Sequence, residues 1–152
     1  MKYVIFDIDG VLADCSHRLH YLEGNKKDYD AFYNACVDDT PIKETGSLFK
    51  LISHCGLDDD NTVNLVLLTG RSECSREQTY SWIEKHFGIT KTWYILIMRK
   101  DNDYREDWVY KQEHAEKLGF ENILFVFEDR KRVVDMWRKN GVICYQTCDA
   151  DY

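Results

Sequence analysis

The sequence predicts an α/β fold, a Rossmann-like three-layer sandwich with a five-stranded parallel sheet. Five short apolar runs punctuate the chain, and segments with helical spacing of apolar residues separate them. Short apolar runs are typical of strands buried on both faces of a parallel sheet, and intervening helices supply the crossovers that parallel strands need. The runs are Tyr3–Phe6, Leu65–Leu68, Trp93–Met98, Ile123–Phe127 and Val142–Tyr145.

The segments between the runs carry apolar residues at positions i, i+3, i+4 and i+7, which form one face of a helix. The stripe from Tyr29 to Cys36 is the first of them along the chain. Glycines such as Gly88 and Gly119 follow several of these segments, and glycine commonly ends a helix. We therefore predict helices over residues 29–36, 48–55, 73–87, 105–118 and 133–137, on both faces of the sheet.

The length of 152 residues suits one hydrophobic core, so we expect a single domain over residues 1–152. The longest interval between predicted strands runs from Val11 to Asn64 and contains two predicted helices. This interval is too short for a folded lid, so we expect a minimal cap or no cap domain over the sheet.

The composition limits the classes of partner. A formal net charge of -7 argues against broad, non-specific binding along nucleic acid, but it allows recognition of one phosphorylated end. No apolar run is long enough to cross a membrane, and no signal-peptide pattern precedes Tyr3, so we expect a cytoplasmic location. The six cysteines form no C-x-x-C pair, which favours reduced thiols. Nothing in the sequence indicates an obligate protein partner.

Two aspartates, Asp7 and Asp9, follow the first apolar run one residue apart, and Gly10 comes next. Alternate residues of a strand share one face, and open α/β sheets bind their ligands at the carboxyl ends of the strands. Two close carboxylates repel each other unless a cation or a proton lies between them. This motif therefore predicts bound Mg²⁺ and phosphate chemistry.

Polar motifs also follow two other apolar runs. Thr69-Gly70-Arg71 follows the second run, and Glu128-Asp129-Arg130 follows the fourth. Because the carboxyl ends of parallel strands lie along one edge of a sheet, we expect the three motifs to converge on one site.

The residue types in these motifs suit the hydrolysis of a phosphate monoester. Asp7 is the predicted nucleophile, which would form an aspartyl-phosphate. Asp9 is placed to protonate the leaving oxygen and later to deprotonate the attacking water. Asp129 would hold Mg²⁺ together with Asp7 and the backbone carbonyl of Asp9. The Thr69 hydroxyl and backbone N–H groups near Gly70 would bind phosphate oxygens, and a lysine is needed to balance Asp7.

Together the three motifs resemble those of the haloacid dehalogenase (HAD) superfamily of phosphohydrolases. The likeness extends to the phosphatase domain of bacteriophage polynucleotide kinase-phosphatases, and it runs from about Tyr3 to Thr147. The resemblance implies the HAD fold and Mg²⁺-dependent removal of 3′-phosphates from nucleic-acid ends. It rests also on the runs Met98-Arg99…Asp103-x-Arg105-x-Asp107-x-x-x-Lys111 and Asp129-Arg130…Val133-Val134-Asp135-Met136-Trp137-Arg138…Gly141.

The same resemblance assigns further residues. Lys111 is the motif lysine, Arg71 helps to hold the substrate phosphate, and Arg18 supplies another phosphate contact. Lys100 is the alternative lysine, because it stands nearer to the end of its predicted strand. Glu128 stands where the phage domains tend to carry an aspartate, and we expect it just outside the direct ligands of the metal.

Three other functions remain open. A small-molecule nucleotidase acting on nucleoside monophosphates would use the same residues. A phosphoacceptor signalling domain would instead carry adjacent acids after the first strand and an aspartate after the third, where this chain has Met98-Arg99-Lys100. An inactive HAD-like binding module would normally have lost Asp7 or Asp9, and both are present.

Overall fold

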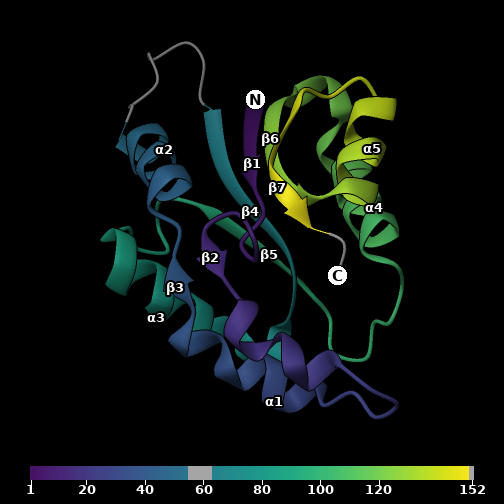
Figure 1. The fold of residues 1–152 in the computed structure, drawn as a ribbon. Coiled ribbons are helices and arrows are strands. Elements are labelled where there is room, and N and C mark those ends of the chain that lie inside the picture. The colour runs from purple at the N-terminus through teal and green to yellow at the C-terminus, as the bar shows by residue number, and fades with distance from the viewer. Residues whose placement is uncertain (55–62, 151–152) are drawn as a thin grey trace.

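A parallel sheet with helices on both faces forms the centre of the computed structural model, which describes residues 1–54 and 63–150 (Figure 1). All neighbouring strands of this sheet pair in parallel. The strand with the first apolar run lies in the middle, so the residues after it reach the centre of the carboxyl edge. The spatial order is β5 (Ile95–Arg99), β4 (Val63–Ser72), β1 (Lys2–Phe6), β6 (Ile123–Arg130) and β7 (Cys144–Ala150). The predicted α/β fold class is confirmed.

Two layers of helices cover the sheet, and alternation along β1 divides the core between them. Phe6 packs in one cluster with Phe49 and Trp82, whereas Ile5 packs in the other with Trp137. All four aromatic side chains are at most 2 % exposed, so each face buries large apolar area. The first face is covered by α2 (Lys43–His54) and α3 (Arg76–Phe87), and the second by α4 (Asp107–Leu118) and α5 (Lys131–Lys139).

The segment between β1 and α2 lies beyond the carboxyl ends of the strands (Figure 1). Its two short strands pair antiparallel and form a ribbon apart from the main sheet. Within the described parts of the chain this segment is a small cover, and no separate cap domain is seen. Its elements are β2 (Ala13–Asp14), η1 (Ser16–Leu22), α1 (Tyr29–Asn34), η2 (Ala35–Asp38) and β3 (Thr40–Pro41). Two further short turns are η3 (Glu73–Ser75) and η4 (Phe120–Asn122).

Several element boundaries differ from those predicted. Trp93 lies in a turn before β5 and is 59 % exposed, so the strand begins two residues later than predicted. The predicted core stripe from Tyr29 is wrong at its first residue, because Phe32 and Cys36 are buried while Tyr29 is 41 % exposed. β7 begins at Cys144 instead of Val142, after α5 ends in a turn with Gly141 at φ 78°. The predicted end of the second helix, at residue 55, lies outside the described residues.

Among the described residues, no helix is both long and apolar enough to cross a membrane. Cys36, Cys74, Cys144 and Cys148 carry free thiols, which agrees with the predicted reduced state for these four.

Candidate active site

Three carboxylates meet at the carboxyl ends of the two central strands. Asp7 follows β1, and Glu128 and Asp129 lie near the end of β6; all three are at most 5 % exposed. One oxygen from each lies within 4.8 Å of the others. Gly10 makes room for this cluster, since a Cβ there would lie 2.0 Å from Asp129 Oδ2 and the backbone has φ +77°. Buried carboxylate oxygens at this spacing suit a hard divalent cation such as Mg²⁺.

Lys111 joins two of these carboxylates. It lies on the second turn of α4, and its Nζ donates to Asp7 Oδ2 and Glu128 Oε2, both at 2.7 Å. Its side chain is 1 % exposed, and burial lowers its pKa, but the neighbouring carboxylates outweigh burial and raise it well above the usual value. Lys111 is therefore a buried cation, whereas Lys100 is exposed on the rim of the cleft described below.

The acidic cluster carries more negative charge than Lys111 balances. Burial raises the pKa of Asp7 well above its ordinary value, although the Lys111 ammonium opposes that rise. Burial likewise raises the pKa of Glu128 to about 7. Burial therefore makes these carboxyls costly to ionise, and a bound cation would favour their ionised forms. Glu128, which we expected just outside the direct ligands, offers an oxygen within the same group.

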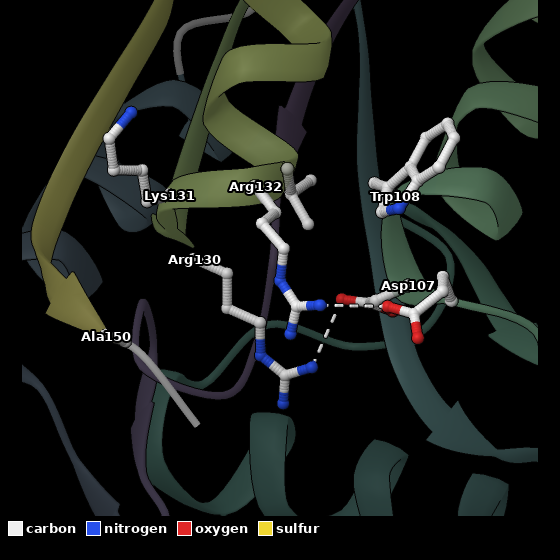
Figure 2. A pocket seen from close by; sticks show the side chains of 8 residues that line it. Asp107, Trp108, Arg130, Lys131, Arg132 and Ala150 are labelled. Carbon is white, nitrogen blue, oxygen red and sulfur yellow. Dashed lines mark hydrogen bonds and ion pairs between the residues drawn. The ribbon is translucent and has the colours of Figure 1, made fainter.

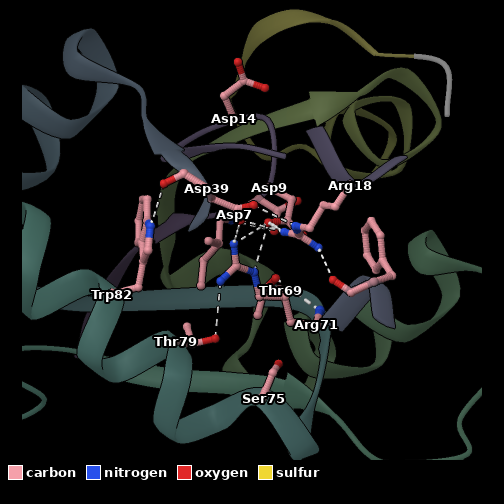
Figure 3. A network of polar contacts seen from close by, with 12 residues as sticks. Asp7, Asp9, Asp14, Arg18, Asp39, Thr69, Arg71, Ser75, Thr79 and Trp82 are labelled. Carbon is pink, nitrogen blue, oxygen red and sulfur yellow. Dashed lines mark hydrogen bonds and ion pairs between the residues drawn. The ribbon is translucent and has the colours of Figure 1, made fainter. Parts of the chain in front are cut away.

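Asp9 faces two arginines instead of the acidic cluster (Figure 3). Its Oδ1 accepts from Arg18 Nη2 at 2.7 Å and from Arg71 Nη2 at 2.6 Å. Both guanidinium groups are fully buried. Burial alone would raise the pKa of Asp9, but Arg71 and Arg18 lower it below its ordinary value. The first aspartate of the motif thus lies beside a lysine and the second beside arginines.

Asp39 completes this network, and sequence reasoning missed it. Its Oδ2 accepts from Arg18 at 2.7 Å and from Arg71 at 2.6 Å, and its backbone oxygen accepts from Trp82 Nε1 at 2.8 Å. His17 Nε2 lies 2.9 Å from Asp39 Oδ1. Asp39 follows η2 in the cover and belongs to no motif, so only the folding of the cover over the sheet brings it to the arginines.

The Thr69-Gly70-Arg71 motif lies within the last part of β4. Thr69 is buried, and its Oγ1 accepts from the Arg71 backbone N–H at 3.3 Å. A Cβ at Gly70 would lie 2.8 Å from Asp107 Oδ1, so glycine allows the first turn of α4 to approach the strand. Asp107 also accepts from Arg99 Nη2 at 2.8 Å. The close approach helps to bring α4, and with it Lys111, to the carboxyl edge.

One open cleft of about 760 Å³ is lined by five of the site residues predicted from the sequence, whereas the buried Arg18 is not part of its lining. Asp7, Asp9, Thr69, Gly70 and Arg71 all line it. The structure therefore brings the first two motifs to one cleft, with Lys111 and Asp129 buried behind Asp7. Residues of the cover, from η1 and α1, form the wall opposite the strand ends.

A smaller hollow of about 110 Å³ adjoins the cleft between the first turns of α4 and α5 (Figure 2). Arg130 and Arg132 line both spaces. Arg130 Nη1 lies 3.5 Å from Asp107 Oδ2, and Arg132 Nη1 lies 3.1 Å from Glu106 Oε2. The two arginines extend the basic lining of the cleft toward α5.

Comparison with known proteins places this site in a family. The family model described as "Polynucleotide kinase PNKP phosphatase domain" matches residues 1–152. A protein of Autographa californica nuclear polyhedrosis virus, described as "Putative bifunctional polynucleotide kinase/RNA ligase", is 31 % identical over 139 residues. That match covers 90 % of this chain but 18 % of the viral protein.

Solved structures agree with the family match. Two structures of the Pnkp1/Rnl/Hen1 complex, one described as an RNA repair complex, are similar with TM-scores of 0.73. Their identities are 27 % and 29 %, and the matches cover 99 % of this chain but 43 % and 47 % of theirs. A haloacid dehalogenase-like hydrolase from Streptococcus pneumoniae shares the fold at 13 % identity and a TM-score of 0.60, over 96 % of this chain and 84 % of that chain. The chain spans less than half the length of the viral protein and of the Pnkp1 complex chains. It belongs to the PNKP phosphatase domain family and is a phosphatase of the HAD type.

Proposed function

We propose that this domain is a Mg²⁺-dependent phosphomonoesterase that removes 3′-phosphates from nucleic-acid ends through an aspartyl-phosphate on Asp7. The observation that carries the proposal is the pairing of Asp7 with the buried Lys111, in a cleft that also presents Arg71. The family description and the RNA repair complex among the similar structures support a nucleic-acid end as the substrate.

The buried acidic cluster fits a divalent cation. Asp7 and Asp129 would hold Mg²⁺ together with the backbone carbonyl of Asp9, and Glu128 offers a further oxygen. When bound, Mg²⁺ would neutralise charge on the oxygens of the transferred phosphoryl group.

Charge within the cleft suits a substrate phosphate. Asp7 would attack the phosphorus in line, the bond from phosphorus to the 3′-oxygen would break, and Lys111 would stabilise the charge on Asp7. In the free protein Arg18 and Arg71 keep Asp9 ionised. A phosphate dianion would compete with Asp9 for these arginines, which raises the pKa of Asp9 and allows it to carry a proton.

Asp9 would deliver that proton to the departing 3′-oxygen. In the second step Asp9 would accept a proton from water as the water oxygen attacks the phosphorus. The bond from phosphorus to Asp7 then breaks, which releases inorganic phosphate, restores the Asp7 carboxylate and leaves Asp9 protonated. Asp9 loses this proton to solvent when the phosphate leaves and the arginines pair with it again. Asp39, which accepts from both arginines, would keep their guanidinium groups in place throughout.

The direct test compares four substrates in the presence of Mg²⁺. These are an oligonucleotide with a 3′-phosphate, the same oligonucleotide with a 5′-phosphate, and free 3′- and 5′-nucleoside monophosphates. We expect phosphate release from the 3′-phosphorylated end and none from the 5′-phosphorylated end. Release from the free nucleotides alone would make the domain a small-molecule nucleotidase and would contradict the proposal.

Cation binding has a readout that does not depend on activity. We expect Mg²⁺ to raise the thermal midpoint of unfolding at about pH 8, because the cation neutralises carboxylates that burial makes costly to ionise. Asp129→Asn removes one ligand charge and should abolish most of the rise, whereas Asp149→Asn, at an exposed residue outside the cluster, should keep it. An equal rise in both variants would show that Mg²⁺ acts elsewhere.

We also propose a cytoplasmic location for the protein. We expect the purified domain to release phosphate without a protein partner, and an assay with the domain alone tests this, because the similar Pnkp1 chains are described in complexes with Rnl and Hen1.

A further inference from the structure

Three tyrosines gather on the outer wall of the cleft. Tyr29 and Tyr33 lie on α1, and Tyr104 lies in the connection between β5 and α4. The ring centroids of Tyr29 and Tyr33 are 6.4 Å apart with an interplanar angle of 26°, and those of Tyr29 and Tyr104 are 6.5 Å apart at 59°. Two chain segments far apart in sequence thus build one aromatic surface, called here the tyrosine surface.

The tyrosine surface is open to water. Tyr29 is 41 % exposed and Tyr104 is 78 % exposed, while Tyr33 is partly buried. Exposed tyrosines that lie together on one wall of a cleft leave apolar area uncovered, which a flat ligand can bury. Because all three residues line the same cleft as Asp7, a ligand on this surface can extend to the nucleophile.

α1 connects the tyrosine surface to the arginines that donate to Asp9. Phe32, on the same helix, is buried and lies under Arg18, whose guanidinium carbon is 4.2 Å from the ring centroid. Arg18 Nη1 also donates to the Phe32 backbone oxygen at 3.3 Å. The next residue, Tyr33, is partly buried and lines the same cleft as Asp9 and Arg99. One short helix therefore contacts Arg18 on its buried side and carries two tyrosines toward the cleft.

The rim beside the tyrosine surface carries charges of both signs, and the exposed acids Asp30 and Asp101 line it as well as two lysines. Lys27, before α1, and Lys100, after β5, are exposed and line the cleft. Aromatic rings flanked by cations are the elements with which proteins bind single-stranded nucleic acid, since the rings stack on bases and the cations contact phosphates. The cations suit the phosphates that precede the terminal nucleotide.

We propose that Tyr29, Tyr33 and Tyr104 form a stacking site for the base of the nucleotide whose 3′-phosphate reaches Asp7. This inference rests on the proposed function and extends it to the substrate class, a terminal nucleotide with its base present. Because any base can stack on an aromatic ring, we expect the site to bind terminal nucleotides with little dependence on the identity of the base.

The test combines variants with a change in the substrate. Removal of base stacking costs about 1–3 kcal/mol per base, so the double variant Tyr29→Ala/Tyr104→Ala should raise KM for a 3′-phosphorylated oligonucleotide about 5- to 150-fold. We expect kcat to change little, because the variant leaves Asp7, Asp9 and Lys111 untouched. The variant Tyr29→Phe/Tyr104→Phe keeps the rings and should keep the KM of the unaltered protein.

An oligonucleotide whose 3′-phosphorylated terminal residue is abasic separates stacking from a structural role. On this substrate the unaltered protein should already show the raised KM, and the alanine variant should add nothing further. An alanine effect of equal size with and without the terminal base would overturn the proposal. So would an unchanged KM in the alanine variant with the complete oligonucleotide.

Free 3′-nucleoside monophosphate distinguishes the terminal base from its neighbours. The alanine variant should lose affinity for this nucleotide as well, because it contains the terminal base. A loss confined to the oligonucleotide would place another base on the tyrosines and would contradict the assignment. Trp93→Ala serves as the matched control, since Trp93 is 59 % exposed, stacks on His54 and lies outside the cleft lining.

Failure of the proposed function has a different signature. If the unaltered protein releases phosphate from none of these substrates, the proposed function fails and the stacking site falls with it. If the unaltered protein is active on 3′-phosphates and the alanine variant matches it on every substrate, the stacking site alone is refuted.

Discussion

Asp7→Asn is expected to abolish phosphate release while the fold stays intact. An asparagine amide is a poor nucleophile toward phosphorus, so the loss should be at least about 10⁴-fold in kcat. The structural cost should be small, because the asparagine oxygen can still accept from one of the two donors that Asp7 serves. These donors are the Ile8 backbone N–H and Lys111 Nζ, both at 2.7 Å.

The measurement is steady-state phosphate release together with circular dichroism and thermal unfolding of the same sample. Asp14→Asn is the matched control, since Asp14 is exposed and its Oδ1 accepts from the nearby Ser16 backbone N–H at 2.9 Å. The control should keep full activity. Activity of Asp7→Asn within about tenfold of the unaltered protein, well short of the loss expected for a nucleophile, would refute the aspartyl-phosphate mechanism.

The sequence predicts the sheet well because burial on both faces leaves a strong local pattern. Ile5 and Phe6 are neighbours in one apolar run, and they pack into opposite core clusters. The same pattern locates the site, because Asp7 and Asp129 each lie at or just beyond the end of a central strand. Parallel strands bring such residues to one edge whatever the intervening sequence.

Other parts of the site depend on packing between distant segments and leave no local signal. Asp39 contacts Arg18 across 21 residues and Arg71 across 32. Tyr29 has the spacing of a buried helical face, but in the structure it is exposed and lines the cleft. Phe32 of the same helix is buried and packs against Arg18. The spacing of apolar residues identifies one face of a helix but does not tell which part of the protein that face will pack against. These residues therefore could not be assigned from the sequence.

Lys111→Met is expected to destabilise the fold as well as to remove activity. Lys111 Nζ donates to both Asp7 and Glu128, and all three side chains are at most 6 % exposed. Methionine fills a similar volume but leaves two carboxylates in the core without their shared cation. Breaking a buried ion pair in this way costs about 3–5 kcal/mol in the free energy of unfolding.

The same variant has a pH signature in EDTA, with no divalent cation bound. Lys111 lowers the pKa of Asp7 and of Glu128, so its removal lets burial raise both further, from a value for Glu128 that is already about 7. A carboxyl whose pKa is higher in the folded state than in the unfolded state binds extra protons on folding. This proton binding stabilises the folded state at low pH, and the stabilisation is lost as pH rises through the pKa of the folded state. The loss of stability should therefore be larger at about pH 8 than at about pH 5.5.

Lys100→Met separates the buried lysine from the alternative that the sequence left open. Lys100 is exposed on the rim of the cleft, so this variant should lie within about 0.5 kcal/mol of the unaltered protein at both pH values. Urea unfolding of the two variants in EDTA gives the comparison. Equal, small losses in both would mean that Lys111 does not offset the buried charge of Asp7 and Glu128. If Lys111 balances the buried carboxylates, the free energy of unfolding should fall strongly in Lys111→Met alone, and the fall should grow with pH. The exposed Lys100 has no buried charge to neutralise, so its removal cannot produce this result.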